Sequence, residues 1–243
     1  MQEDILDYHE NYKLLKDTDL FNSLDENILK DMIRECKLVF WKKTETINSD
    51  IGIKYLHIIL DGRLKVTQID PTTGRSILLF LLEKGDIFDI FSLLDGEEHT
   101  TFPIAIDDIT ALCIPIDRAR EWIYEYHIFN KNFLPYLGKR MRELEAFGES
   151  MVFDDIATRL SKLILRHVNP KEKLSEHHSV RLINNLSHES LSEMIGSVRS
   201  VVSTQMKKLK NEEIILNKRG QLSVKNLEEL IKKCDFIKKS KKL

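Results

Sequence analysis

The chain has 243 residues, of which 42% are apolar and 31% are charged, so its length fits one large or two modest domains with buried cores. It contains no run of about 18 apolar residues, and its first residues lack the basic-then-apolar order of a signal peptide. We therefore expect a cytoplasmic protein without a membrane span. Three widely spaced cysteines without a C-x-x-C pair argue against a disulfide framework, a zinc site and a cysteine-ligated iron–sulfur cluster.

The formal net charge of −2 hides two parts of opposite sign. From Asp154 to Leu243 there are 19 Lys and Arg against 11 Asp and Glu, which leaves 18 against 28 in the preceding part. The first balance is +8 and the second is −10. A basic C-terminal part suits a nucleic-acid binder, because neutralisation of phosphates dominates affinity.

From Phe40 to Pro115 the sequence shows short β-rich runs separated by turn residues. The expected strands are 55–60, 63–69, 76–82, 104–106 and 110–114, with turns at 61–62, 70–74 and 84–86. Many short strands at such spacing predict a small barrel or jelly roll.

Helical periodicity returns with a short helix over 117–126 and a long one over 129–153. The long helix carries apolar residues at alternating spacings of 3 and 4, with a glycine in one of the slots. These positions are Leu134, Leu137, Met141, Leu144, Gly148 and Met151. They predict a two-stranded coiled-coil dimer seam of about three heptads, and the alternative is a helix lying on its own domain's core. Pro135 is tolerated only near a helix start, so we expect an irregular first turn. Asp154 and Asp155 are typical of a helix cap and indicate a hinge.

The segment 186–209 predicts two short helices around a tight turn at Gly196, which can adopt a positive φ. Ser187 is placed to cap the first helix, and its residues Leu191, Met194 and Ile195 share one apolar face. The second helix is expected to bury Val198, Val201, Val202, Met206 and Leu209. Its other face carries Arg199, Ser200, Ser203, Thr204, Lys207 and Lys208.

That outer face offers positive charge and hydrogen-bond donors without bulky apolar groups, as a major-groove helix requires. From this segment alone, the alternative is an ordinary helical hairpin with a solvated polar face. The next residues favour DNA binding, because strands at 214–216 and 222–224 with a turn at 217–220 predict a wing. Its Lys218 and Arg219 are expected to reach phosphates.

Taken together, these segments resemble a known family. They are YLHIILDGRLKV, the TTGR hairpin, EKGDIF, the long helix, FDDIATRLSKLIL and LSHESLSEMIGSVRSVVSTQMKKLKNEEII. In this order, from about Leu20 to Leu230, they resemble the bacterial regulators named after the cyclic-AMP receptor protein and the fumarate–nitrate reduction regulator.

The resemblance implies an α+β fold in three parts. These are a β-roll sensor domain of the cyclic-nucleotide-binding jelly-roll kind with N-terminal helices (1–126), a dimerisation helix (127–153) and a winged helix-turn-helix domain (154–243). It also implies a homodimer that binds a palindromic site on double-stranded DNA, with RNA polymerase as a further partner.

Departures from the family pattern concern the ligand. Asp89-Ile90 stand where nucleotide-binding members carry Gly-Glu, and Thr100-Thr101 stand where they carry Arg-Ser. Leu144 and Glu145 replace the hydroxyls that contact the base. We therefore expect no cyclic AMP binding, and the N-terminal cysteines of iron–sulfur members are absent.

The pocket region suggested by the resemblance is largely apolar. Its expected residues are Phe88, Asp89, Ile90, Phe91, Thr100, Thr101, Phe102, Met141 and Leu144. The region could hold an apolar effector or haem, or it could be filled core. Haem needs an axial ligand, for which His57, His99 and His127 are the candidates.

In the DNA-binding part, Arg199 matches a family position that reads guanine. Ser200 and Thr204 replace the usual Glu and Arg, so the half-site is expected to differ from the TGTGA type. Ser197 is expected to cap the second helix, and Ser187 and His188 to meet phosphates. The expected DNA-binding set is Ser187, His188, Ser197, Arg199, Ser200, Ser203, Thr204, Lys207, Lys218 and Arg219.

The leading hypothesis is a homodimeric transcription regulator that senses a signal other than cyclic AMP. An alternative is a regulator that is active without any ligand. A cupin-like enzyme with a DNA-binding appendage is the rival from another class. Such an enzyme needs clustered metal ligands, and His57 and His99 form no H-x-H pair, so we expect neither catalysis nor a metal site.

Overall fold

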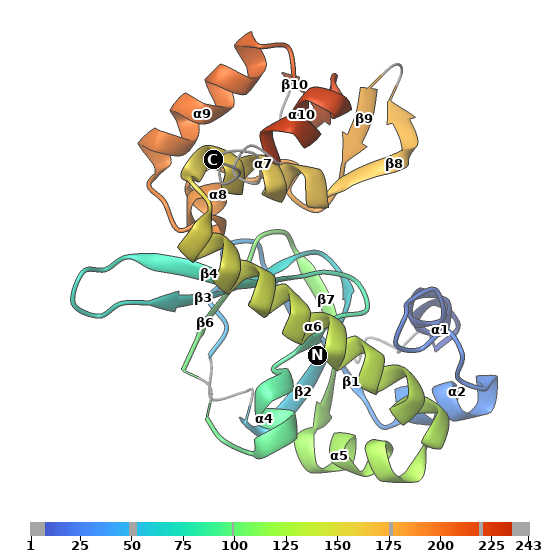
Figure 1. Ribbon diagram of the computed structural model, residues 1–243. Coiled ribbons are helices and arrows are strands. Elements are labelled where there is room, and N and C mark those ends of the chain that lie inside the picture. Colours follow the sequence, from blue (N-terminus) through green and yellow to red (C-terminus); the bar gives the residue numbers. More distant parts are fainter. Residues whose placement is uncertain (1–7, 49–52, 99, 175–176, 219–220, 235–243) are drawn as a thin grey trace. The chain divides into compact units, whose positions relative to one another are not determined.

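The computed structural model describes residues 8–48, 53–98, 100–174, 177–218 and 221–234 (Figure 1). The chain divides into two compact units. One comprises Met1–Gly74 with Leu79–Glu143, and the other comprises Arg75–Leu78 with Leu144–Leu243. Among the residues described, no helix is both long and apolar enough to cross a membrane.

The first unit is a β-roll with helices at both of its chain ends. Its helices are α1 (Tyr8–Lys16), α2 (Glu26–Arg34), α4 (Ile90–Asp95), α5 (Ile116–Glu125) and most of α6 (His127–Phe153). Its strands are β1 (Lys37–Trp41), β2 (Tyr55–Asp61), β3 (Leu64–Ile69), most of β4 (Ser76–Leu82), β5 (Ile87–Phe88), β6 (Phe102–Ala105) and β7 (Ile109–Pro115). They form two sheets, in the orders β1-β7-β2-β5 and β4-β3-β6. The predicted jelly roll is confirmed.

Two apolar clusters form the core of this unit. One lies between the two sheets and includes Trp41, Ile59 and Phe88. The other lies between the sheet of β2 and β7 and the helices, where Trp122 and Phe129 are almost fully buried. The second cluster attaches the N-terminal half of α6 to the β-roll, because burying an aromatic side chain removes a large apolar area from water.

The predicted strands match the observed ones to within about three residues, and β4 has the predicted bounds. The sheet begins at Lys37 rather than near Phe40, and β6 begins at Phe102 rather than Ile104. The segment 87–95 was not predicted in detail. It holds a two-residue strand and one short helix, which are both too short to show a period.

Helix α6 confirms the predicted long helix, but the prediction about its proline is wrong. Pro135 is the ninth residue of this 27-residue helix and therefore lies two turns inside it. The ring removes one backbone donor. Packing of Phe129, Phe133 and Tyr136 in the core outweighs this loss, because all three are buried on the same face.

The second unit is a winged helix domain. Its helices are α7 (Ile156–Arg166), α8 (His188–Met194), α9 (Arg199–Asn211) and α10 (Leu227–Cys234). Its strands are β8 (Val168–Leu174), β9 (His177–Val180), β10 (Ile215–Lys218) and β11 (Gln221–Val224), in the sheet order β10-β11-β9-β8.

The wing is larger than predicted. The sequence interpretation missed β8, β9 and α10, and the predicted hairpin proves to be half of a four-stranded sheet. Asn217 and Lys218 were placed in the turn, whereas they belong to β10 and pair with Leu222 and Gln221. Pairing with a neighbouring strand supplies backbone partners that the local sequence does not reveal.

Candidate nucleic-acid interface and effector pocket

Helix α8 begins as predicted. The Ser187 Oγ accepts a hydrogen bond of 3.0 Å from the backbone N–H of Ser190, which makes Ser187 the N-cap. Leu191 and Ile195 are buried, and Met194 is half-buried. Gly196 has a φ of 59°, so the predicted tight turn is confirmed.

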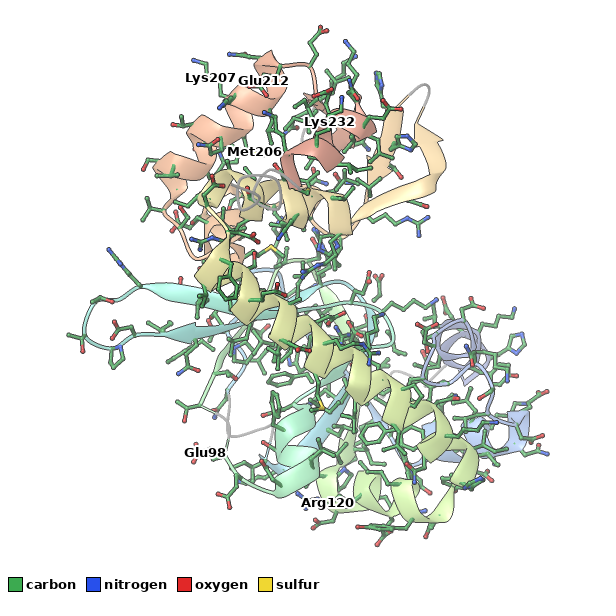
Figure 2. The ribbon with its side chains drawn as sticks, viewed as in Figure 1. Glu98, Arg120, Met206, Lys207, Glu212 and Lys232 are labelled. Carbon is green, nitrogen blue, oxygen red and sulfur yellow. The ribbon has the colours of Figure 1, made fainter. Side chains whose placement is uncertain are left out.

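Helix α9 has one buried side and one exposed side. Val202, Met206 and Leu209 are buried. Arg199, Ser200, Thr204, Lys207 and Lys208 are exposed. Figure 2 labels Met206 and Lys207, which are neighbours in the sequence but lie on the buried and exposed sides. The exposed side presents cations and hydroxyls from one rigid helix, which is the arrangement that major-groove reading requires.

Two predictions at the start of α9 are wrong. Val198, expected inside, is 51% exposed because it occupies the N-cap position, and its side chain makes no capping bond. Ser197, expected to cap, lies one residue too early. Its Oγ is buried and has no hydrogen-bond partner among the described residues. The first turn of α9 therefore lacks a side-chain cap.

His188 and Ser203 meet between α8 and α9. The Nδ1 of His188 lies 2.8 Å from the Oγ of Ser203, which also donates to the carbonyl of Arg199 at 2.9 Å. This contact links the two helices of the motif.

The remaining predicted DNA contacts lie elsewhere on this unit. Ser187 is exposed at the start of α8, and Lys218 is exposed at the end of β10. Arg219 lies outside the described residues. The described members of the predicted set therefore lie in or next to α8 and α9, and at the end of β10.

The β-roll contains a small cavity with a volume of about 20 Å³, which is room for about one water molecule. It is lined by Val66, Phe80, Leu82, Ile87, Phe88, Asp89, Ile90, Phe91, Tyr136 and Arg140. Four predicted pocket residues, Phe88 to Phe91, are among them.

The other five predicted pocket residues do not line this cavity. Thr100, Phe102 and Met141 are exposed, and Leu144 belongs to the other unit. Thr101 is buried, but its Oγ1 has no hydrogen-bond partner in the described part of the chain. These positions were transferred along the chain from the family pattern, and the structure places none of the five in the wall of this cavity.

The sequence interpretation missed two polar residues of the cavity wall, Tyr136 and Arg140. The Arg140 guanidinium forms a buried ion pair with Asp86. The Tyr136 hydroxyl accepts a 3.1 Å bond from the backbone N–H of Ile87. Burial and the neighbouring Asp86 raise the pKa of Tyr136 to about 12. Spacing could have revealed Arg140, because it follows Phe133 and Tyr136 on the buried face of α6.

The segment that forms the cavity wall is also held from α5. Arg120 (Figure 2) donates to the backbone carbonyls of Ser92 and Leu93, at 2.7 and 2.9 Å, and thereby satisfies the end of α4. Gly96 follows with a φ of 78° and ends the helix in the left-handed conformation.

The residues present do not fit a cyclic nucleotide. Among the residues that line the cavity, Arg140 is the cation and Asp89 the carboxylate. Arg140 is already paired with Asp86, and Asp89 is buried. A phosphate would therefore enter a largely apolar space without a cation left to pair with it, which costs free energy in a low dielectric.

The candidate haem ligands are dispersed. His57 is buried on β2 between the rings of Trp41 and Phe88, and it does not line the cavity. His127 is exposed at the start of α6, and His99 lies outside the described residues. Across the described ranges, no group of three or more His, Cys, Asp or Glu side chains is placed to hold a metal ion.

Family models match both units of the chain. The cyclic nucleotide-binding domain matches residues 41–126, and the Crp-like helix-turn-helix domain matches residues 158–233. Together they cover about two thirds of the chain, in the order in which the fold places them.

Individual proteins show the same likeness over most of their length. A CRP-like cAMP-activated global transcriptional regulator of Mycobacterium tuberculosis is 22% identical over 193 residues, or 79% of this chain and 85% of the relative. The global nitrogen regulator of a Synechocystis species is 23% identical, over 70% of this chain and 76% of the relative.

Two solved structures share the fold. A mutant of CooA from Carboxydothermus hydrogenoformans superimposes with a TM-score of 0.73 at 22% identity, covering 90% of this chain and 96% of that one. FixK2 from Bradyrhizobium japonicum has a TM-score of 0.66 at 16% identity, covering 81% and 96%.

A cyclic-nucleotide-binding β-roll followed by a Crp-like winged helix defines a class of DNA-binding transcription regulators, and not of enzymes. The chain belongs to the CRP/FNR family of these regulators.

Proposed function

We propose that this protein is a homodimeric, sequence-specific regulator that binds a palindromic operator through α9 and senses a signal other than cyclic AMP. The observation that carries the proposal is the exposed face of α9, on which Arg199, Ser200, Thr204 and Lys207 lie together. Two such helices related by a two-fold axis would read half-sites about one helical turn, or roughly 34 Å, apart.

The homodimer is supported by the second face of α6. Its first face is buried against the β-roll, yet Leu134 and Met141 on the other face are 61% and 70% exposed. Large apolar side chains exposed in a row mark an interaction surface. The predicted seam is not uniform, since Leu137 packs partly against the core and Met151 lies against Gly196.

The nature of the signal is supported by the cavity. Its wall combines aromatic side chains with Asp89 and with Arg140, which is paired with Asp86, and its volume of about 20 Å³ corresponds to about one water molecule. A signal would have to displace side chains of this wall. A regulator that is active with a filled cavity is the second candidate, and the small volume favours it. Haem binding, RNA polymerase contact and a cytoplasmic location stay predictions.

The test is selection of operator sequences with the purified full-length protein, followed by titration of a palindrome and of a matched DNA with one half-site scrambled. We expect the palindrome to bind at least tenfold more tightly. Equal affinities for both DNAs would contradict the dimeric reading. Cyclic AMP at millimolar concentration is expected to change neither the operator affinity nor the midpoint of thermal unfolding.

A further inference from the structure

One side chain, Arg159 at the start of α7, contacts three segments of the second unit. Its Nη1 donates to the carbonyl of Ile195 at 2.7 Å and lies 3.0 Å from the Sδ of Met151. Its Nε donates to the carbonyl of Asp154 at 3.2 Å. Arg159 therefore joins the last turn of α6, the start of α7 and the turn of the helix-turn-helix.

The turn itself lies tightly against α6. A Cβ placed on Gly196 would lie 2.7 Å from the Sδ of Met151 and 3.4 Å from the Nη1 of Arg159. The first distance is shorter than any van der Waals contact allows. The positive φ is what favours glycine at this position, while the short distance shows that the turn lies against the flexible end of the Met151 side chain.

The junction between α6 and α7 is braced independently. The carboxylate of Asp154 accepts hydrogen bonds from the Ser150 hydroxyl at 2.7 Å and the Lys162 ammonium at 2.6 Å. The side chain of Asp155 caps α7 through the backbone N–H of Thr158 at 2.8 Å. These bonds hold α6 and α7 together, and the bond from Arg159 to the carbonyl of Ile195 joins this junction to the turn of the helix-turn-helix.

We propose that Arg159 is a positioning residue for operator recognition, which sets the direction of α9 relative to the end of α6. This rests on the proposed function, because the direction matters only if two recognition helices bind one DNA. Arg159 is half-buried, and its Nε and Nη1 donate to groups within the protein, so we assign its effect to α9 and not to a phosphate contact. It determines which half-site spacing the dimer accepts.

The test compares Arg159→Met with Arg166→Met. Arg166 is exposed in the last turn of the same helix, so both variants lose one positive charge and keep a long side chain. Each protein is titrated with the selected palindrome, with palindromes one base pair shorter or longer in the spacer, and with a single half-site. The salt dependence of binding is measured on the palindrome.

For Arg159→Met we expect the affinity for the selected palindrome to fall tenfold or more. Its preference over the altered spacers should shrink to within about threefold, while single half-site affinity stays within twofold of wild type. The slope of log affinity against log salt should match that of Arg166→Met, because no phosphate contact distinguishes the two. Arg166→Met should keep the wild-type spacing preference.

Each other outcome has a defined meaning. If the wild-type protein binds the palindrome no more tightly than a single half-site, the proposed function is refuted. If Arg159→Met keeps the wild-type preference for the selected spacer length, only the role of Arg159 is overturned. If Arg159→Met loses as much affinity for the single half-site as for the palindrome, Arg159 only supports the fold of the DNA-binding unit, and the proposal is overturned. If Arg159→Met does not fold, Met151→Ala tests the same contact without changing charge, and an unaltered spacing preference in that variant would overturn the proposal.

Discussion

His57 is the titratable side chain whose burial has the clearest consequence for stability. It is 2% exposed, and its Nδ1 has no hydrogen-bond partner among the described residues. Burial lowers its pKa from 6.5 to about 4, although the nearby Asp89 acts in the opposite direction. Between those two pH values the unfolded chain binds more protons than the folded one, so the free energy of unfolding must fall as pH falls.

Lowering the pH from 7 to 4.5 should therefore cost the β-roll about 2–3 kcal/mol through this residue. His57→Gln should remove that component, and His127→Gln, at an exposed position, should keep it. Urea unfolding followed by tryptophan fluorescence measures the effect in the compact unit that contains His57, since Trp41 and Trp122 both lie in that unit. The same loss in wild type and His57→Gln would show that another group is responsible.

Arg199 and Lys207 lie on the same exposed face but are expected to act differently. If Arg199 reads a guanine, Arg199→Ala should weaken operator binding by about 1–3 kcal/mol and relax selectivity at one base pair of each half-site. Lys207→Ala should weaken binding to all sequences alike and reduce the salt slope by about one per subunit. Binding titrations over a library of single-base operator variants distinguish the two. Unchanged selectivity in Arg199→Ala would exclude base reading by this residue.

Single side chains were predictable where a local pattern constrains them. Ser187 was found from its place before an apolar period, and Gly196 from its place between two helices. Val198 and Ser197 were assigned the wrong way round, because the start of a helix can move by one residue without changing the periodicity behind it. Arg140 was missed because its partner, Asp86, lies 54 positions away in the sequence.

Helix α7 depends on a short cap at the junction with α6. The Asp155 carboxylate accepts from the backbone N–H of Thr158 at 2.8 Å, so Asp155→Ala should lower stability by about 1 kcal/mol. Asp155→Asn keeps an acceptor at the same place and should retain most of the stability. Thermal unfolding followed by far-ultraviolet circular dichroism checks both. A loss in Asp155→Asn as large as in Asp155→Ala would indicate that charge, and not the cap, matters.

Helix α6 shows how one periodic sequence serves two surfaces. Phe129, Phe133 and Tyr136 pack into the β-roll, while Leu134 and Met141 stay exposed on the other side. The sequence interpretation weighed a dimer seam against a helix lying on its own core. The helix does lie on its own core, and the exposed pair Leu134 and Met141 leaves the dimer seam as a prediction, since a period of 3.6 residues can carry two apolar stripes.

The assembly of two chains should depend on the exposed stripe of α6. Leu134→Lys would place a charge in an apolar seam, which should raise the dimer dissociation constant at least a hundredfold. Tyr124→Lys is the matched control, because Tyr124 is 86% exposed on α5 and gains the same charge. Sedimentation velocity over a range of concentrations measures the effect. A wild-type chain that sediments as a monomer at micromolar concentration would refute the seam.

The sequence by itself determined the order of the two units, the long helix, most strands of the β-roll and the helix-turn-helix. Each of these follows from contacts between near neighbours, which leave a period of 2 or 3.6 residues in the chain. The tertiary structure alone decided that Arg140 pairs with Asp86, that Arg159 reaches Ile195, and that the wing joins β8 and β9 in one sheet. These contacts join residues far apart in the chain, and no local period records which distant segment will supply the partner.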